Sequence, residues 1–357
     1  MLFKHALFRD NFLFTNLKKL YLQNTIINNM SEEFTYIDIA KGIGIFLVVL
    51  GHYVNPFFMP DYFQHIVNFV YTFHMPLFMA MSGFLFGKSF GKVNNYRSFV
   101  LKKSQRLLIP YFTISILLFG IKYIAGFFVP LKYPAELNSL FFHIFLQPNS
   151  GFAAFLWFMY TLFLIFCIVP FFRKLWILGV FSLVLYYLPL PDIFCINLVG
   201  QFLIYFTFGI WIYQQRVTIN KQVSKFPFTF IIFLCLYLVP QYSNMIWNAS
   251  LSLLVGLCGS FSVYLTSLFI SYNTKSILYK CNYLLGKASS QIYLLHTFCM
   301  GAIIPILSLF PVYIPQIRFH IDLIVTVCGG IIIPILLAKY FILKNKTLSL
   351  LLLGCSR

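Results

Sequence analysis

Ten apolar stretches run along the chain, and short polar segments separate them. A helix crosses the hydrocarbon core of a bilayer with about 20 residues, whereas a membrane barrel needs strands in which apolar and polar residues alternate. The stretches are continuously apolar, so they predict an all-α integral membrane protein, a polytopic bundle of about ten transmembrane helices. The expected helices are 39–58, 66–86, 107–129, 151–171, 175–190, 197–214, 226–241, 246–270, 288–309 and 321–343.

Composition excludes several other classes of protein. Of the 357 residues, 60% are hydrophobic and only 10% are charged, and the mean hydropathy is +0.85. A soluble domain has about 45–50% apolar and about 25% charged residues, so a soluble enzyme and a disordered protein are both excluded. The eight cysteines are scattered along the chain, which argues against a disulfide-stapled secreted domain and against a metal site.

The positive charges predict the orientation in the membrane. Cytoplasmic loops of membrane proteins collect Lys and Arg. With the N-terminus inside, the inner segments hold all of the 26 Lys and Arg residues except Lys122, Lys132 and Arg318. We therefore expect both termini to be cytoplasmic. This distribution also accounts for the net charge of +18 without a nucleic-acid partner.

The chain divides into three parts by hydropathy. Residues 1–35 form an N-terminal cytoplasmic segment, 36–344 the membrane domain and 345–357 a cytoplasmic tail. The first segment has no apolar run long enough for a crossing or a signal peptide. We expect Met30 to be the true start, so that 1–29 would not be translated. The alternative is a basic amphipathic segment lying on the inner leaflet.

Three ionisable residues share one stripe of the first expected helix. Asp38 precedes Lys41 by three positions, and the eleven steps from Lys41 to His52 make three turns plus about 20°. His52 would therefore lie about 16 Å deeper than Lys41 on the same face. An ionisable side chain at that depth is costly in hydrocarbon and is a functional candidate by default.

A second histidine is expected at a similar depth. His74 lies twelve residues from the inner end of the second expected helix at Phe86, and His52 lies thirteen from Ile39. Pro76 frees a backbone carbonyl one turn earlier, and Gly83 permits close helix approach. A buried histidine that only bonds to a neighbouring helix is the alternative for either residue. Two histidines at matched depth make a catalytic site the better hypothesis.

At these positions the chain resembles the acyltransferase 3 family of membrane O-acyltransferases, and more closely its branch similar to fucose 4-O-acetylases. The resemblance rests on five sequence motifs spread over most of the chain. They are Asp38-x-x-Lys41-Gly42 with Gly51-His52, the stretch FHMPLFMAMSGFLFG at 73–87, Lys103-x-x-Arg106 with LLIPY at 107–111, Leu156-Trp157-Phe158, and IYLLH at 292–296. Many family members have Arg at the positions of Lys41 and Lys103, whereas Lys is usual at the first in the fucose-acetylase-like branch.

The resemblance implies a reaction and its partners. Such enzymes have about ten membrane helices and move an acyl group, commonly acetyl, from cytoplasmic acyl-coenzyme A to a sugar hydroxyl of a surface or secreted glycan. The expected partners are therefore acyl-coenzyme A as donor substrate, a glycan or lipid-linked sugar as acceptor, and membrane lipids. No permanently bound cofactor is expected. The expected location is a bacterial plasma membrane.

Acyl transfer to a hydroxyl needs a base and a site for the phosphates of the donor. His52 is the expected catalytic residue, either as general base or as transient acyl carrier, and His74 would orient it or stabilise the oxyanion. Lys41, with Lys102, Lys103 and Arg106 in the basic loop 88–106, would hold the phosphates. Asp38 is too far from His52 to orient it and is expected to pair with Lys41 or another base at the inner mouth. The alternative for the loop is a simple positive-inside anchor.

Other interpretations stay open at the level of sequence. His296 matches a family motif, but a helix-packing histidine fits equally well. A glycan polymerase or lipid-linked sugar flippase would share the hydrophobicity and the basic inner loops, but it would place functional charges in large outer loops. A secondary transporter would show related halves with paired broken helices, and no such repeat is found.

Overall fold

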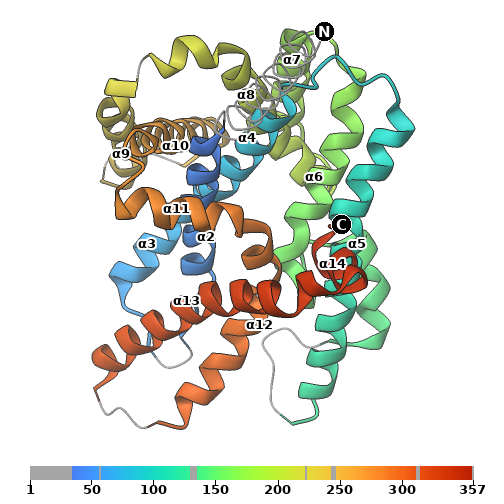
Figure 1. Ribbon diagram of the computed structural model, residues 1–357, viewed down its shortest axis with the longest axis vertical. Helices are drawn as coiled ribbons and strands as arrows, with labels where there is room; N and C mark the ends of the chain where they lie inside the picture. The colour runs from blue at the N-terminus through green and yellow to red at the C-terminus, as the bar shows by residue number, and fades with distance from the viewer. Residues whose placement is uncertain are drawn as a thin grey trace, which may run out of the picture.

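The computed structural model describes residues 34–55, 58–128, 135–221, 223–242, 247–310 and 314–355. The expected start at Met30 lies outside these residues. Every regular element within them is a helix (Figure 1). They are α2 (Thr35–Gly51), α3 (Asp61–Tyr71), α4 (His74–Phe86), α5 (Tyr96–Ala125), α6 (Trp157–Ile168), α7 (Leu175–Tyr187), α8 (Ile196–Asn220), α9 (Phe226–Tyr242), α10 (Ala249–Ser271), α11 (Ile277–Lys287), α12 (Ser289–Ser308), α13 (Pro315–Tyr340) and α14 (Lys346–Leu353), with short 3-10 or π turns such as Gly151–Leu156 before α6.

The protein is a polytopic helical membrane protein, as expected. Within the described residues, seven helical stretches are long and apolar enough to cross a membrane, among them Asp61–Phe86, which combines α3 and α4. Two shorter apolar helices, Leu175–Tyr187 and Pro227–Pro240, match the fifth and seventh expected crossings. Helix α2, with 17 residues, falls just below that length. The total of ten crossings and their orientation remain predictions.

Several expected boundaries are wrong, for local reasons. The first helix ends at Gly51 rather than at 58. It could not have continued past Asn55, because the residue before a proline disfavours the helical region. The second is interrupted at Thr72–Phe73, one turn before Pro76, whose ring has no N–H to continue the helix. The third begins at Tyr96, where the Asn95 side chain accepts a hydrogen bond from Ser98 N and caps the helix.

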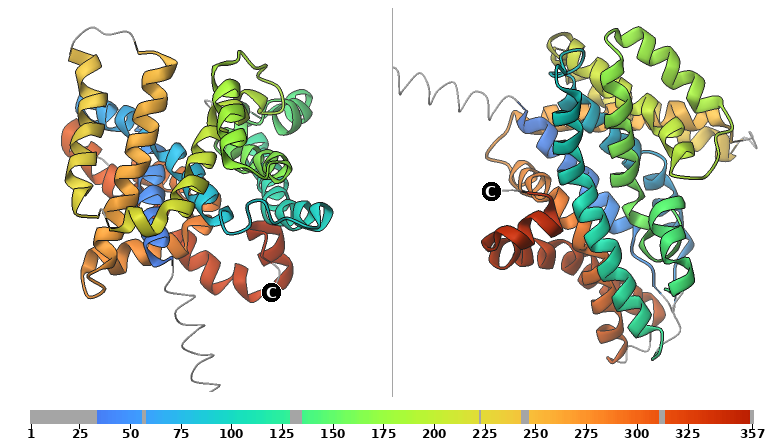
Figure 2. Two further views of the ribbon diagram at one scale, coloured as in Figure 1. Left: turned by 90° about the horizontal axis from the view of Figure 1, so that it is seen from above. Right: turned by 90° about the vertical axis from the view of Figure 1, so that its right-hand side faces the viewer.

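Helix α2 is packed against several other helices. It contacts α3, α4, α10, α11, α12 and α13. Seen from above, α9 and α10 stand on one side of the molecule, and α5 and α6 stand on the other (Figure 2). The start of the first expected helix is therefore enclosed by protein, and its polar side chains face neighbouring helices instead of lipid.

Glycines set the closest helix contacts. A Cβ on Gly83 of α4 would clash with the Phe206 carbonyl of α8, and a Cβ on Gly209 of α8 would clash with the Ala80 carbonyl of α4. The same reciprocal arrangement joins α2 to α11 through Gly42 and Gly286. The expected role of Gly83 in close helix approach is thus present in the structure.

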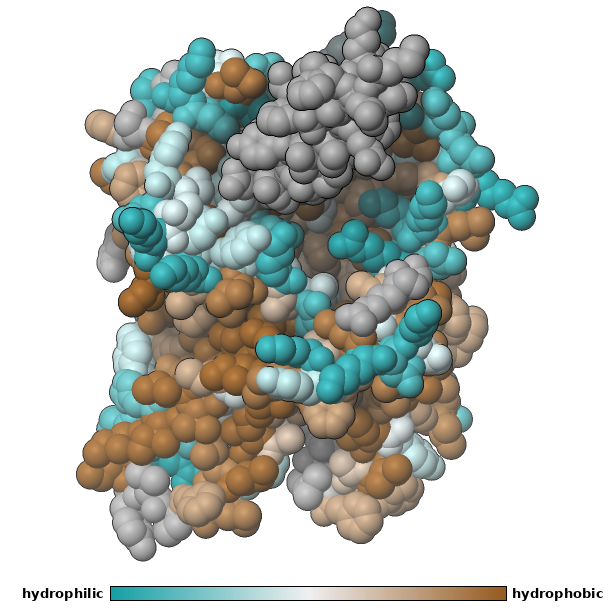
Figure 3. All heavy atoms as spheres, viewed as in Figure 1, coloured by the Kyte–Doolittle hydropathy of each residue, from teal (hydrophilic) through white to brown (hydrophobic). Residues whose placement is uncertain are grey.

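Hydrophobic side chains cover much of the outer surface. Figure 3 shows a broad hydrophobic area in the lower half, over α12 and α13. Exposed side chains of these two helices include Ile306, Ile324 and Ile332. Such a surface would be a liability in water, whereas in a bilayer it faces lipid tails.

Candidate functional site

Three histidines from different parts of the chain lie close together. His52 caps the C-terminal end of α2, His74 is the first residue of α4, and His296 lies in α12. The rings of His52 and His296 meet edge to face, with centroids 5.0 Å apart. The His74 ring lies with its centroid 5.0 Å from that of Tyr71, whose hydroxyl donates to the carbonyl of Gly51, directly before His52. We call these three residues the histidine group.

Backbone hydrogen bonds fix the same tautomer in all three rings. His52 Nδ1 lies 2.8 Å from Val48 O, His74 Nδ1 lies 2.9 Å from Val70 O, and His296 Nδ1 lies 3.0 Å from Ile292 O. A carbonyl oxygen can only accept, so each neutral ring carries its hydrogen on Nδ1. Each Nε2 is therefore left with a lone pair that can take a proton.

His296 has an unpartnered nitrogen. Its side chain is completely buried, and among the described residues Nε2 has no hydrogen-bond partner. Phe155 and His52 flank the ring, with centroids 5.6 and 5.0 Å away. A buried polar atom without a partner is costly and calls for an explanation, and a site for substrate or a reacting group is one.

Tyr71 connects the two histidines of the first helices. Its hydroxyl donates to the carbonyl of Gly51, directly before His52, at 2.7 Å. Its ring lies with its centroid 5.0 Å from that of His74. Tyr71 ends α3, one step before the break at Thr72–Phe73. The break therefore places Tyr71 and His74 side by side against the end of α2.

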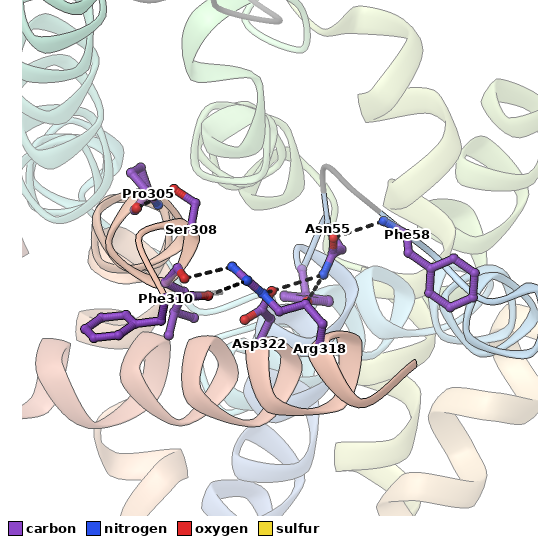
Figure 4. A network of polar contacts seen from close by, with 9 residues as sticks. Asn55, Phe58, Pro305, Ser308, Phe310, Arg318 and Asp322 are labelled. Atoms are coloured by element: carbon purple, nitrogen blue, oxygen red, sulfur yellow. Dashed lines mark hydrogen bonds and ion pairs between the residues drawn. The ribbon is translucent and has the colours of Figure 1, made fainter. Parts of the chain in front are cut away.

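A polar network holds the segment after His52 against α12 and α13 (Figure 4). Arg318 donates from Nε to Asp322 at 2.7 Å and from its two terminal nitrogens to the carbonyls of Leu307 and Phe310. Asn55 Nδ2 lies 3.5 Å from the same Asp322 oxygen. A cation suits the negative end of α12, so this network fixes the ends of the helices that carry His52 and His296.

A second group of charges lies at the start of α2. Asp38 forms ion pairs with Lys41 at 2.6 Å and with Lys287 at 3.0 Å. Lys287 ends α11, which Gly42 and Gly286 bring directly against α2. The hydrogen bond to Asp38 raises the pKa of Lys287 above its ordinary value. The carboxylate is thus paired with two cations, of which Lys287 was not expected.

The remaining expected cations lie on α5 rather than in a loop. Lys102, Lys103 and Arg106 all fall within its first three turns, because α5 begins at Tyr96. Lys103 Nζ lies 3.8 Å from the centroid of the Phe166 ring, while Lys102 and Arg106 are exposed. Within the described ranges, no ion pair joins these residues to Asp38. They are therefore outside the ion-paired group that Asp38, Lys41 and Lys287 form.

The sequence singled out His52 and His74 as candidates, left two interpretations open for His296 and did not single out Tyr71. His296 lies far along the chain from His52, and Tyr71 lies outside the quoted motifs. The contacts of both with His52 or its neighbour Gly51 depend on tertiary packing. A signal for His296 was present in its motif at 292–296. Among the described residues, no cluster of His, Cys, Asp or Glu could hold a metal ion.

One family model and two curated proteins match parts of this chain. The family model of an acyltransferase domain, that of the acyltransferase 3 family, matches residues 34–339. The nodulation protein NolL of Mesorhizobium japonicum is 38% identical over 93 residues, which is 23% of this chain and 22% of that protein. NolL of Sinorhizobium fredii is 41% identical over 81 residues, 20% of this chain and 21% of that protein. These alignments thus span about a fifth of the curated relatives, and no solved structure matches the chain.

Proposed function

The chain belongs to the acyltransferase 3 family, and from this premise we propose that it transfers an acetyl or similar group from cytoplasmic acyl-coenzyme A to a sugar hydroxyl of a cell-surface or secreted glycan. Membership makes it a multi-pass membrane acyltransferase that needs an acyl donor and an acceptor. Acetyl-coenzyme A, a sugar acceptor and a bacterial plasma membrane are the finer parts of the proposal. They rest on the resemblance to the fucose 4-O-acetylase branch.

The observation that carries the proposal is the orientation of His52. Its Nδ1–H is held by Val48 O, so Nε2 is free to accept the proton of a hydroxyl. The same hydrogen bond stabilises the imidazolium that results, as a carbonyl or carboxylate partner does for other catalytic histidines. We write the reaction with His52 as the general base.

The reaction then needs one tetrahedral intermediate. His52 Nε2 takes the proton of the sugar hydroxyl while its oxygen attacks the thioester carbonyl carbon. The intermediate collapses, the carbon–sulfur bond breaks, and the imidazolium returns the proton to the coenzyme A thiolate. Atoms and charge balance without a further reactant. Such a base contributes about 10²–10⁴-fold to the rate.

The other histidines would support this step in a different way from the oxyanion role considered for His74. In its neutral form His74 has its only N–H bonded to Val70 O, so it has no donor for an oxyanion. A charge on His74 would also oppose the charge that forms on His52. We therefore assign His74 to positioning, through Tyr71, and His296 to the wall beside the reacting atoms.

The donor would enter from the side of Asp38. On an ideal helix Lys41 lies about 16 Å from His52, of the order of an extended pantetheine arm. Lys41 and Lys287 would bind the phosphates, with Asp38 holding both ammonium groups in place. A second set of cations could also bind the phosphates of the donor: Lys102, Lys103 and Arg106. They would do so through charge-assisted hydrogen bonds, which are stronger than hydrogen bonds between neutral groups.

Mass spectrometry of surface glycans tests the proposal. A strain that lacks the chain should lose one acetyl group per modified sugar. The wild-type chain should restore it, and His52→Ala should not, although it accumulates in the membrane. His65→Ala, which alters an exposed histidine on α3, is the matched control and should restore acetylation. Wild-type acetylation by His52→Ala would refute the mechanism.

A further inference from the structure

A cavity of about 480 Å³ lies next to the histidine group, and no step described above uses it. It is bounded by the break between α3 and α4 and by α7, α8 and the start of α10. Its volume falls within the range of about 300–1,000 Å³ that is usual for small-molecule sites. The cavity is thus large enough for a ligand, and its walls come from four regions of the chain.

The wall nearest the histidines comes from the α3–α4 break. Tyr71, Thr72 and Pro76 all line the cavity, and His74 lies between them in sequence. Tyr71 also donates to the carbonyl of Gly51, beside His52. One side of Tyr71 therefore faces the cavity while its other contacts are to the histidine group. A ligand in the cavity would therefore contact a residue that itself contacts the histidine group.

The rest of the lining combines aromatic rings with neutral polar groups. Phe202, Tyr205 and Trp247 supply rings, and Asn68, Gln201 and Ser252 supply hydrogen-bonding groups. One tyrosine of the lining is held in place by a hydrogen bond. Tyr186 donates to Ala249 O at 2.9 Å and so joins α7 to α10. Among the described residues that line the cavity, none is charged.

This lining matches one class of ligand. A sugar ring presents an apolar face of C–H groups, which stacks on an aromatic ring, and an edge of hydroxyls, which bond to amides and hydroxyls. A phosphate or a carboxylate would enter without a cation to pair with, and burial of an unpaired charge is costly. The lining therefore favours an uncharged sugar and disfavours the phosphates of the donor.

We propose that this cavity is the acceptor subsite and binds an uncharged sugar residue, stacked on Trp247 and hydrogen-bonded by Gln201, with its reactive hydroxyl directed past Tyr71 toward His52. The assignment rests on the proposed function. It adds the residues that select the acceptor, and it places donor and acceptor on different sides of the histidine group.

Two substitutions and two matched controls test the assignment. Gln201→Leu and Trp247→Ala alter the cavity, whereas Gln214→Leu on the same helix α8 and Trp176→Ala on α7 alter exposed residues outside it. Each variant is expressed in the strain that lacks the chain, and glycan acetylation is measured together with the amount of membrane protein. Binding of acetyl-coenzyme A is measured on the purified full-length variants.

We expect both cavity variants to lower acetylation at least about tenfold, which corresponds to the loss of one good contact. Their dissociation constants for acetyl-coenzyme A should equal that of the wild-type protein, and both controls should behave as wild type. Trp247→Phe keeps a stacking ring and should recover most of the acetylation, which separates a binding role from a folding defect.

Two results would overturn the assignment. Wild-type acetylation by Gln201→Leu and Trp247→Ala would show that the cavity does not select the acceptor. Loss of acetyl-coenzyme A binding in these variants would assign the cavity to the donor. Failure of the proposed function would give a different result from failure of the cavity assignment, because the wild-type chain itself would then restore no acetyl group.

Discussion

At the scale of single residues, the chemistry depends on which nitrogen of each histidine is free. His52 and His74 are both bonded through Nδ1 to the carbonyl four residues earlier. In both residues the ring folds back onto the preceding turn of its own backbone. His296 repeats it inside α12 and leaves Nε2 buried without a partner among the described residues.

His296 provides the sharpest test at this scale. Phenylalanine has a similar ring and fills the same space but cannot accept a proton or a hydrogen bond. If Nε2 of His296 accepts a hydrogen bond from the substrate in the wall beside the reacting atoms, His296→Phe should lower turnover about tenfold, because a buried polar partner left unsatisfied costs about 1–3 kcal/mol. The measurement is acetyl transfer by purified protein at equal concentration. A packing histidine would instead tolerate the change and give wild-type turnover.

At the scale of elements, the contacts of α2 and α4 set the position of the site. Helix α4 carries His74, and its Gly83 lies against the backbone of α8. Helix α2 carries His52, and its Gly42 lies against the backbone of α11. Small residues allow such approach in membranes, where helices gain little from the hydrophobic effect.

Gly83→Ala should therefore destabilise the protein. The added methyl group would meet the Phe206 backbone, which cannot rotate away, and overpacking of this kind costs about 1–3 kcal/mol. Gly120→Ala on α5 is the control, since no heavy atom lies within 4 Å of its added Cβ. The melting temperature in detergent should fall for Gly83→Ala and stay level or rise for Gly120→Ala. Equal melting temperatures would contradict the account of α4–α8 packing.

The helices were largely predictable, and the reasons for the errors are local. Long apolar runs such as 197–214 mark helices because backbone groups in lipid must be satisfied within the helix. The break before Pro76 was foreseeable as a freed carbonyl but not as an interruption of the helix. Helix α11, with several polar residues, gave no apolar run at all, and so its Lys287 was missed.

The site was predictable only in part. Spacing on one helix gave Asp38, Lys41 and His52, because an ideal helix fixes their separation. Contacts between distant segments, such as His52 with His296 or Asn55 with Asp322, depend on tertiary packing that no local pattern encodes. The cavity beside Tyr71 is of the same kind, since its walls come from four separate regions.

At the scale of the whole molecule, the proposed function requires that the two substrates reach the histidine group from opposite sides. The distribution of Lys and Arg predicts that the start of α2 is cytoplasmic and that the start of α3, at Asp61, is on the outer side. The ion pairs of Asp38 then face the cytoplasmic donor. The cavity beside Tyr71 would face an acceptor that arrives from the outer side.

Accessibility of single cysteines tests this orientation. In a chain without its native cysteines, Ser89→Cys should react with a membrane-impermeant maleimide only when the cytoplasmic face is opened. Asp61→Cys should react on intact cells. Both positions are exposed in the structure, so burial would not prevent labelling. The opposite pattern would reverse the membrane orientation and separate the basic groups from the donor.

The central claim is that His52 acts as the general base for acyl transfer between the two substrates. Inside-out membrane vesicles expose the cytoplasmic face to added substrate. They can be given acetyl-coenzyme A labelled in its acetyl group, and the label in the glycan fraction can be measured. The account predicts label in glycan with the wild-type chain and none above background with His52→Ala, at equal amounts of protein. Transfer by His52→Ala at the wild-type rate would contradict it.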